Sequence, residues 1–360
     1  MKKTVVLVLV LSLLLSGCSF WMDGEYSSVV PHTEPNAQVN TSVTSVANYY
    51  QIQTSLVSMI KSGTESAVLT IKYDSVEQAQ EDIEKIIESL LQKNPYAAYA
   101  VDKIRYEVGT NSGQTAFSVK ISYLQNRIDV KKIQEVKDLG EVRKLIVQHL
   151  DDCAPGLVLY VEDWKQTDYA QIVADYALTY PQKVMEAPQV TVNMYPESGA
   201  KQIVELKFTY QTSRESLRTM QSHVALVFSS AELYVDRSDV PLEQCLQLYT
   251  FLMNRYSSYE IQTSITPAYS LLRHGVGDEK AFAMVYAAMC RRVGLDAQVV
   301  VGTRDAQPWI WNVVEIDGVF YHIDLLRCVS EEVFAAYPGQ EMQGYVWDFS
   351  EYPIPEEINT

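Results

Sequence analysis

Four short sequences in the last third of the chain decide its fold class: Gly277-Asp278-Glu279-Lys280-Ala281-Phe282-Ala283, Gly294-Leu295-Asp296-Ala297-Gln298-Val299-Val300, Trp309-Ile310-Trp311-Asn312 and Tyr321-His322-Ile323-Asp324. The spacing of apolar residues predicts a helix over 278–293, and alternation predicts strands over 297–302, 309–316 and 319–325. Two more helices are predicted just before them, over 241–256 and 266–273. Helices followed by consecutive strands predict an α+β domain whose helices pack on an antiparallel sheet.

These four sequences resemble the bacterial transglutaminase-like family, which belongs to the papain-like superfamily. In that family a Cys opens the central helix, a His precedes a Trp-Asn pair on the next strand, and an Asp ends the following strand. The resemblance implies acyl-transfer chemistry. The helix dipole lowers the pKa of the thiol, the imidazole moves protons, and the carboxylate orients the imidazole.

Two of the three catalytic residue types are missing from this chain. Aligned on Gly294 and on the Trp311-Asn312 pair, the Cys position is Glu279, the His position is Trp309 and the Asp position is Asp324. A carboxylate does not replace a thiolate nucleophile, and an indole N–H neither accepts nor releases a proton near neutral pH. We therefore expect a degenerate, non-catalytic site, in which Glu279 simply begins a helix capped by Asp278. Glu279, Trp309, Trp311 and Asp324 remain candidates for ligand binding.

Two enzymatic alternatives stay open, in which the last domain is a hydrolase or a transamidase that uses a relocated site. Glu279 and Asp324 form a carboxylate pair of the kind that glycoside hydrolysis uses. Cys328 follows the last strand and is a candidate relocated thiol, whereas Cys290 lies about 16 Å along the helix from Glu279. His322 is expected to point to the opposite strand face from Asp324, because side chains alternate along a strand.

The first residues have the pattern of an export signal. Two lysines precede an apolar run of eleven residues from Val5 to Leu15, which is too short to span a bilayer as a helix. Leu15-Ser16-Gly17-Cys18 then resembles the lipobox of bacterial lipoproteins, which implies removal of residues 1–17 and acylation of Cys18, as with palmitate. Two acyl chains hold a protein firmly at a membrane. We expect a lipid anchor at the extracytoplasmic face of the cell membrane.

The mature chain is strongly acidic. Removing residues 1–17 takes away two lysines, so 27 basic residues (29 minus 2) face 45 acidic ones and the net charge becomes −18. This charge argues against nucleic acid and anionic lipid as direct partners. Neither a CxxC motif nor a metal-binding His spacing is present, so no metal or cofactor is expected. The remaining cysteines lack the spacing of a disulfide scaffold, and buried free thiols are favoured although export permits disulfides: Cys153, Cys245, Cys290 and Cys328.

An internal repeat precedes the last domain. Residues 123, 127, 130, 133 and 134 (Tyr, Arg, Val, Ile, Gln) recur 87 positions later as Tyr, Arg, Leu, Met and Gln. Asn126 and Ser213 occupy equivalent places and are predicted helix N-caps. Each copy has the pattern strand, helix, strand, strand, helix, which predicts two tandem βαββα modules. Neither module contains a recognisable catalytic motif, so a spacer role is preferred.

The expected order is a signal peptide (1–17), the lipidated Cys with a flexible tether and short helix (18–62), repeat module 1 (63–152), repeat module 2 (153–236), a transglutaminase-like domain (237–350) and a tail (351–360). The short helix is predicted over 47–61 and ends at Gly63. The expected function is non-catalytic binding of a peptide, a protein or a cell-wall glycan by the last domain.

Overall fold

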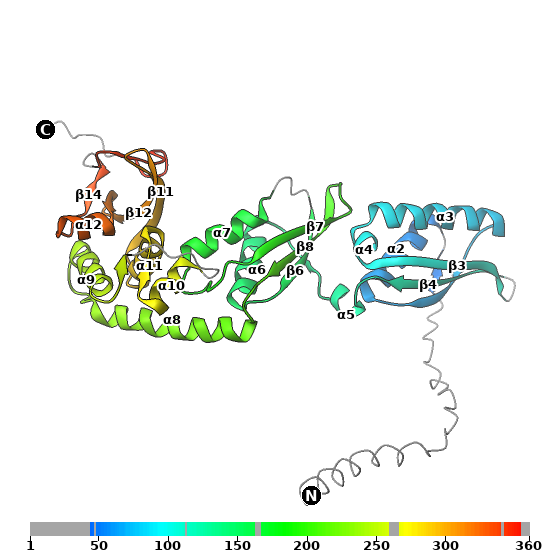
Figure 1. Ribbon diagram of the computed structural model, residues 1–360. Coiled ribbons are helices and arrows are strands. Elements are labelled where there is room, and N and C mark those ends of the chain that lie inside the picture. The colour runs from blue at the N-terminus through cyan, green and yellow to red at the C-terminus, as the bar shows by residue number, and fades with distance from the viewer. Residues whose placement is uncertain are drawn as a thin grey trace, which may run out of the picture.

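The computed structural model describes residues 44–46, 48–111, 114–162, 167–258, 266–339 and 342–353. The predicted signal peptide, Cys18 and most of the predicted tether lie outside these residues. Three bodies follow one another along an extended molecule (Figure 1). None of the helices in the described ranges is long and apolar enough to cross a membrane.

The first body is a four-stranded sheet with helices on one face. Its elements are β1 (Thr44–Val46), α2 (Tyr49–Ser62), β2 (Ser66–Ile71), α3 (Val76–Lys93), α4 (Pro95–Ala100), β3 (Val101–Asn111), β4 (Gln114–Tyr123) and α5 (Arg127–Val130). The strand order is β1-β2-β4-β3, with β1 parallel to β2 and the other neighbours antiparallel. The short predicted helix is α2, which Asn48 caps and Gly63 ends in the left-handed conformation. The prediction placed this helix in the tether segment, but its buried side chains pack in the core of the first body.

The second body repeats this topology. Its elements are β5 (Gln134–Glu135), α6 (Leu139–Asp151), β6 (Gly156–Glu162), α7 (Tyr169–Thr179), β7 (Gln189–Tyr195) and β8 (Lys201–Thr209). The order β5-β6-β8-β7 has the same strand directions as the first sheet. The predicted boundaries put α6 in the first module, but Val142, Ile146 and Leu150 of this helix pack in the core of the second body. An amphipathic pattern identifies the apolar face of a helix, not the sheet that the face covers.

The first body packs against the open face of the second sheet. Tyr96 stacks on Tyr160 with ring centroids 5.5 Å apart, and Tyr99 meets Tyr195 edge to face at 5.3 Å. Ile203 of β8 is fully buried and belongs to the core of the first body. Aromatic pairs and a shared apolar core therefore join the two bodies.

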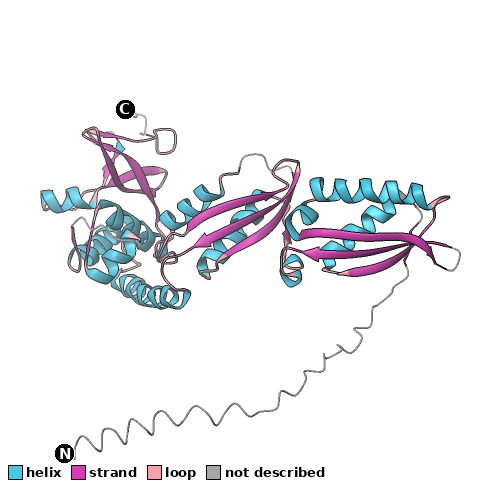
Figure 2. Cartoon of the chain, turned by 45° about the vertical axis from the view of Figure 1, so that its right-hand side comes forward, coloured by secondary structure: helices cyan, strands magenta, loops and turns pink. Residues whose placement is uncertain are grey.

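The third body holds helices and a five-stranded sheet (Figure 2). Its elements are α8 (Arg214–Tyr234), α9 (Pro241–Met253), β9 (Ser257–Ser258), α10 (Pro267–His274), β10 (Val276–Gly277), α11 (Glu279–Arg292), β11 (Asp296–Arg304), β12 (Gln307–Ile316), β13 (Val319–Ile323), α12 (Leu325–Glu331), β14 (Tyr337–Pro338) and β15 (Tyr345–Val346). The main sheet is antiparallel in the order β14-β13-β12-β11-β15. The predicted α+β class, with helices on an antiparallel meander, is confirmed. The third predicted strand ends at Ile323, because Asp324 caps α12.

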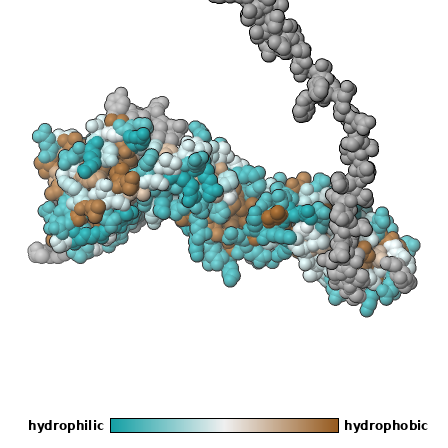
Figure 3. Space-filling view, turned by 90° about the horizontal axis from the view of Figure 1, so that it is seen from below, coloured by the Kyte–Doolittle hydropathy of each residue, from teal (hydrophilic) through white to brown (hydrophobic). Residues whose placement is uncertain are grey.

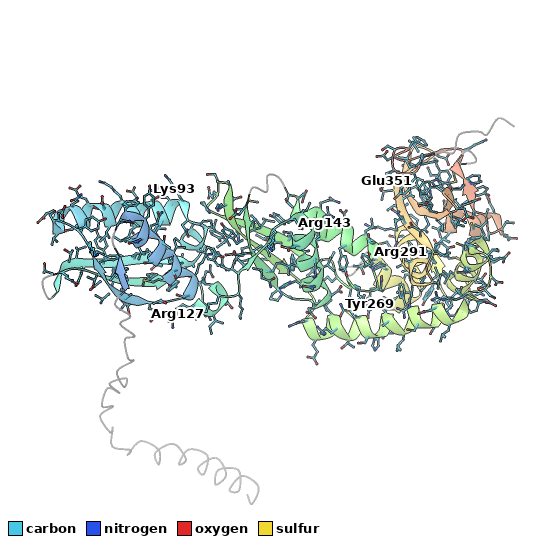
Figure 4. The ribbon with its side chains drawn as sticks, turned by 180° about the vertical axis from the view of Figure 1, so that it is seen from behind. Lys93, Arg127, Arg143, Tyr269, Arg291 and Glu351 are labelled. Atoms are coloured by element: carbon cyan, nitrogen blue, oxygen red, sulfur yellow. The ribbon has the colours of Figure 1, made fainter. Side chains whose placement is uncertain are left out.

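Helix α8 connects the second body to the third. Ser213 caps it, as Asn126 caps α5, so both predicted N-caps are confirmed. The predicted boundaries put this helix in the second module, but Leu217, Val224 and Phe228 pack in the core of the third body. Arg291, labelled in Figure 4, reinforces the junction by donating to the carbonyl oxygens of Ala297 and of Thr179 in α7.

Candidate functional site

Glu279 stands at the start of the central helix of the third body. Residues 281–290 of α11 are all buried, and the Asp278 side chain accepts the Ala281 backbone N–H at 2.8 Å. The predicted Asp278 cap is therefore confirmed. Glu279 is half-buried and forms no hydrogen bond or ion pair with another residue of the described ranges. Its carboxylate is placed favourably by the helix dipole, which is worth about 0.3–1 kcal/mol in a first turn.

Asp324 is the centre of a dense hydrogen-bond network. Its Oδ2 accepts from the Trp309 indole at 2.8 Å, the Tyr345 hydroxyl at 2.7 Å and the Arg304 guanidinium at 3.2 Å. Its Oδ1 accepts the backbone N–H groups of Leu326 and Arg327, each at 3.1 Å, and so caps α12. Only 3% of Asp324 is exposed. The structure thus brings Trp309 and Asp324 together, as the motif predicts.

The chemistry of this network is that of a structural carboxylate. Five donors, one of them the ion-paired Arg304 guanidinium, occupy both oxygens of Asp324, which leaves little capacity for a substrate proton. Burial, reinforced by the hydrogen bond to Asp324, raises the pKa of the Tyr345 phenol, so this hydroxyl stays a donor. The indole of Trp309 donates its proton to Asp324 but cannot transfer it.

His322 is on β13, and Asp324 directly follows this strand as the N-cap of α12. The prediction that the two side chains point to opposite faces is wrong, because they accept from Trp311 and Trp309, which lie two positions apart on β12 and therefore on one face of the sheet. His322 is 1% exposed, and its Nδ1 accepts the indole N–H of the buried Trp311 at 2.9 Å. Its Nε2 has no hydrogen-bond partner among the described residues. Burial lowers the pKa of His322 to about 4, so the imidazole is neutral at pH 7.

The four cysteines of the described ranges are free and buried, the state favoured from the sequence. Cys328 on α12 is 1% exposed, and its sulfur accepts the Ala335 backbone N–H at 3.4 Å. Burial raises the pKa of the Cys328 thiol, and it also raises that of Cys290. A thiol with a raised pKa is a poor nucleophile, because the thiolate is the reactive form.

We expect thiolate-selective electrophiles to leave the folded protein unlabelled. The measurement is mass spectrometry of a Cys18→Ser variant after reaction with iodoacetamide at pH 6, first under native conditions and then in denaturant. Burial raises the pKa values of Cys153, Cys290 and Cys328, and although the hydrogen bond with Cys290 lowers the pKa of Cys245, this thiol is fully buried. We therefore predict labelling of the four thiols only after denaturation. Rapid native labelling of Cys328 would establish a reactive thiol beside the Asp324 network.

The burial of the candidate binding residues separates them into two groups. Trp311 and Asp324 are buried, whereas Glu279 and Trp309 are half-buried and keep accessible surface. No cluster of three or more His, Cys, Asp or Glu side chains in the described ranges could hold a metal ion. The cavities of about 520 Å³ beside α6 and α8 and of about 330 Å³ between α7 and β11 are lined by other residues.

Two residues of the network, Arg304 and Tyr345, were not predicted from the sequence. Arg304 is the last residue of β11, which runs beyond the predicted strand end at residue 302. Tyr345 is in β15 and is the residue that pairs with Arg304 in the sheet. The segment containing Tyr345 shows no local periodicity, so its contact with Asp324, 21 positions earlier, arises only from the tertiary fold. The one feature of the sequence that could have pointed to Arg304 is its basic side chain just after the predicted strand over 297–302.

Comparison with known proteins identifies the family of the third body. Residues 231–347 match the transglutaminase-like superfamily, so this part of the chain is a transglutaminase-like domain. No curated protein matches the chain.

Three crystal structures show weaker similarity. The first, a TGase, is 10% identical over 54% of this chain and 59% of that chain, with a TM-score of 0.24. A candidate cysteine protease from Cytophaga hutchinsonii is 10% identical over 46% of this chain and 69% of that chain, with a TM-score of 0.27. A candidate protease from Parabacteroides distasonis is 9% identical over 71% of this chain and 39% of that chain, with a TM-score of 0.25. The family assignment rests on residues 231–347 and not on these scores.

Proposed function

We propose that the transglutaminase-like domain of residues 231–347 is a non-catalytic binding module, held by a lipid on Cys18 at the extracytoplasmic face of a cell membrane. The two sheet bodies would act as a spacer between the anchor and the module. The expected ligand is a polypeptide or a cell-wall component, because the active family resembled by the sequence motifs acts on peptide-like amides.

One observation carries the non-catalytic part of the proposal, the hydrogen bond from the Trp309 indole to Asp324. This bond occupies the Asp324 oxygen that would otherwise orient a catalytic imidazole. The indole of Trp309, which has no acid–base chemistry near neutral pH, stands where the family has its catalytic histidine. Glu279, at the helix start, supplies a carboxylate where acyl transfer from an amide needs a thiolate.

The enzymatic alternatives receive less support from the same geometry. A hydrolase using Glu279 and Asp324 needs a carboxyl group that exchanges protons with the substrate, whereas Asp324 is buried and accepts from five donors. A transamidase using Cys328 needs an accessible thiolate, whereas this thiol is buried and its pKa is raised.

Activity is tested on the chain from residue 18 carrying Cys18→Ser, by amine incorporation into glutamine peptides and by hydrolysis of peptide and cell-wall substrates. We expect no turnover above the uncatalysed rate from this protein or from its Glu279→Ala variant. Turnover that disappears in the Glu279→Ala variant, while its circular dichroism spectrum is unchanged, would refute the non-catalytic assignment.

Binding is tested by retention on purified cell-wall material and on immobilised cell-wall peptides. Glu279→Lys reverses the charge of an accessible candidate residue, and Glu77→Lys is the matched control in the first turn of α3. We expect Glu279→Lys to weaken retention about tenfold, the effect of losing one charged contact, and Glu77→Lys to leave it unchanged. Equal retention of both variants would remove Glu279 from the binding surface.

The anchor is tested separately by metabolic labelling with an alkyne analogue of palmitate. We expect label in the membrane fraction for the wild-type chain, and an unlabelled protein released from membranes for Cys18→Ser. A membrane-bound but unlabelled wild-type chain would exclude the lipid anchor without bearing on the binding module.

A further inference from the structure

A cavity of about 520 Å³ lies where the second body meets the third. The second body contributes the end of α6 and the loop after α7, and the third body contributes α8 and the end of α11. Ligand sites are frequent in cavities of this size at the junction of two bodies. The surface around this junction is mostly hydrophilic when it is seen from the α8 side (Figure 3). The cavity therefore suits a polar ligand.

One polar group in this cavity has no partner. The side-chain oxygen Oε1 of Gln182 is buried and accepts no hydrogen bond from the described residues. A buried acceptor that stays unpaired lowers the stability of the fold. The neighbouring amide of Gln221 does not satisfy it, because its Nε2 donates to the backbone oxygens of Asp151 and Lys183 at 3.1 and 2.6 Å. Gln182 thus presents an acceptor that a donor on a bound molecule would satisfy.

The cavity also carries an excess of positive charge. Its lining contains two acidic residues, Asp151 and Asp152, and three basic ones, Lys183, Arg218 and Arg292. Lys183 pairs with Asp151 at 3.6 Å. Arg218 pairs with Asp152 at 3.2 Å. Arg292 is therefore the one basic residue of the lining that has no acidic partner within it.

Arg292 is only partly neutralised from outside the cavity. It forms an ion pair with Glu232 at 2.7 Å, but the same carboxylate also pairs with Arg237 at 2.8 Å. One acid thus faces two guanidinium groups. The Arg292 side chain is 42% exposed, and its Nη1 group forms no hydrogen bond with the described residues. In a chain with a net charge of −16, this local excess of positive charge points to an anionic group on the ligand.

We propose that this cavity binds the carboxyl end of a peptide. The terminal carboxylate pairs with Arg292, because a guanidinium binds a carboxylate through two parallel hydrogen bonds. The N–H groups of the last residues follow at intervals of about 3.5 Å along an extended chain, and one of them donates to Oε1 of Gln182. Ala225 and Phe228 line the same cavity and suit a small apolar side chain at the end of the peptide. A free inorganic anion has no N–H donor and leaves Gln182 unpaired.

This site is separate from the positions aligned with the family's catalytic residues. Glu279 begins α11 and Arg292 ends it, so the two lie about 20 Å apart along the helix at 1.5 Å per residue. Peptide binding in the cavity therefore does not depend on the proposed role of Glu279. It also makes the second body a part of a binding site, in addition to its role as a spacer.

The test is isothermal titration calorimetry at pH 7 on the chain from residue 18 carrying Cys18→Ser. The probes are N-acetyl-trialanine with a free carboxylate, the same peptide with an amidated end, and inorganic phosphate. We expect the free acid to bind and the amide to bind at least about tenfold more weakly, because the amide lacks the charge that pairs with Arg292. Phosphate should show no binding.

Four variants show whether the binding takes place in this cavity. Arg292→Gln keeps hydrogen-bond donors but removes the charge, and should weaken binding of the free acid at least about tenfold. Gln182→Leu should also weaken it about tenfold, while stability in urea stays equal or rises because an unpaired buried acceptor is removed. Arg143→Gln is the matched control, since it changes an exposed arginine of α6 that does not line the cavity (Figure 4). Glu279→Lys should bind the peptide normally, which separates this site from the one proposed above.

Several results would overturn the proposal. They are equal affinity for the acid and the amide, phosphate binding as tight as that of the peptide, and no binding of any probe. Full affinity in the Arg292→Gln variant, with an unchanged circular dichroism spectrum, would overturn it as well. The comparison of acid with amide uses the unchanged cavity, so it keeps the test informative if one variant is unstable.

Discussion

Replacing Asp324 by Ala is expected to lower the free energy of unfolding of the transglutaminase-like domain by about 3–5 kcal/mol, the range found when one partner of a buried ion pair is removed. The change leaves the Arg304 guanidinium, the Trp309 indole and the Tyr345 hydroxyl without their shared acceptor. It also removes the side-chain cap of α12. Urea unfolding followed by tryptophan fluorescence measures the effect, because three of the five tryptophans lie at positions 309, 311 and 347.

Two further variants separate the network from helix capping alone. Asp278→Ala removes a carboxylate that caps α11 through one side-chain hydrogen bond, and should cost about 1 kcal/mol. Asp324→Asn keeps one acceptor oxygen but turns an amide N–H₂ toward three donors, so its cost should lie between those of the two alanine variants. If Asp324→Ala is no more damaging than Asp278→Ala, Asp324 is not the structural centre that its contacts indicate.

The second large effect is expected on acidification, through His322. Its pKa falls from 6.5 in the unfolded chain to about 4 in the folded protein, because burial disfavours the charged imidazolium. The unfolded state therefore binds the proton first. The contribution of the neutral imidazole is fully present above pH 6.5 and is lost as the pH falls through about 4. At about 1.4 kcal/mol for each tenfold change in proton affinity, this loss amounts to about 3 kcal/mol.

The measurement is the free energy of unfolding in urea at intervals from pH 7 to pH 4. The variant His322→Asn keeps an acceptor for the Trp311 indole and removes the titrating ring. We expect this variant to be less stable than the wild type at pH 7, because it leaves a cavity. Its stability should depend less steeply on pH between 6.5 and 4. Parallel pH profiles for the two proteins would contradict the assignment of the acid sensitivity to His322.

Local patterns predicted most of the secondary structure of the last domain. The central helix begins behind Asp278, the predicted cap, and α10 (Pro267–His274) lies within one residue of the helix predicted over 266–273. The motif also paired Trp309 with Asp324 correctly, because the order of residues along consecutive antiparallel strands brings strand ends together. These features depend on neighbours a few positions apart or on adjacent strands.

Other features depended on packing that no local pattern encodes. The apolar faces of α6 and α8 were evident from the sequence, but the core that each face covers was not. The stacking of the first body on the second sheet through Tyr96 and Tyr160 was not anticipated. Neither was the recruitment of Tyr345 to Asp324.

The sequence by itself determined the α+β class, the caps and the loss of the Cys and His types at the aligned positions. The tertiary structure alone decided that Asp324 is saturated by five donors, that His322 is buried beside Trp311, and that Leu226 and Leu233 are left on the surface. The physical reason is the distance along the sequence over which each property is set. Helix and strand periodicity is set by neighbours within a few residues, whereas burial and hydrogen-bond saturation depend on which distant surfaces complement one another.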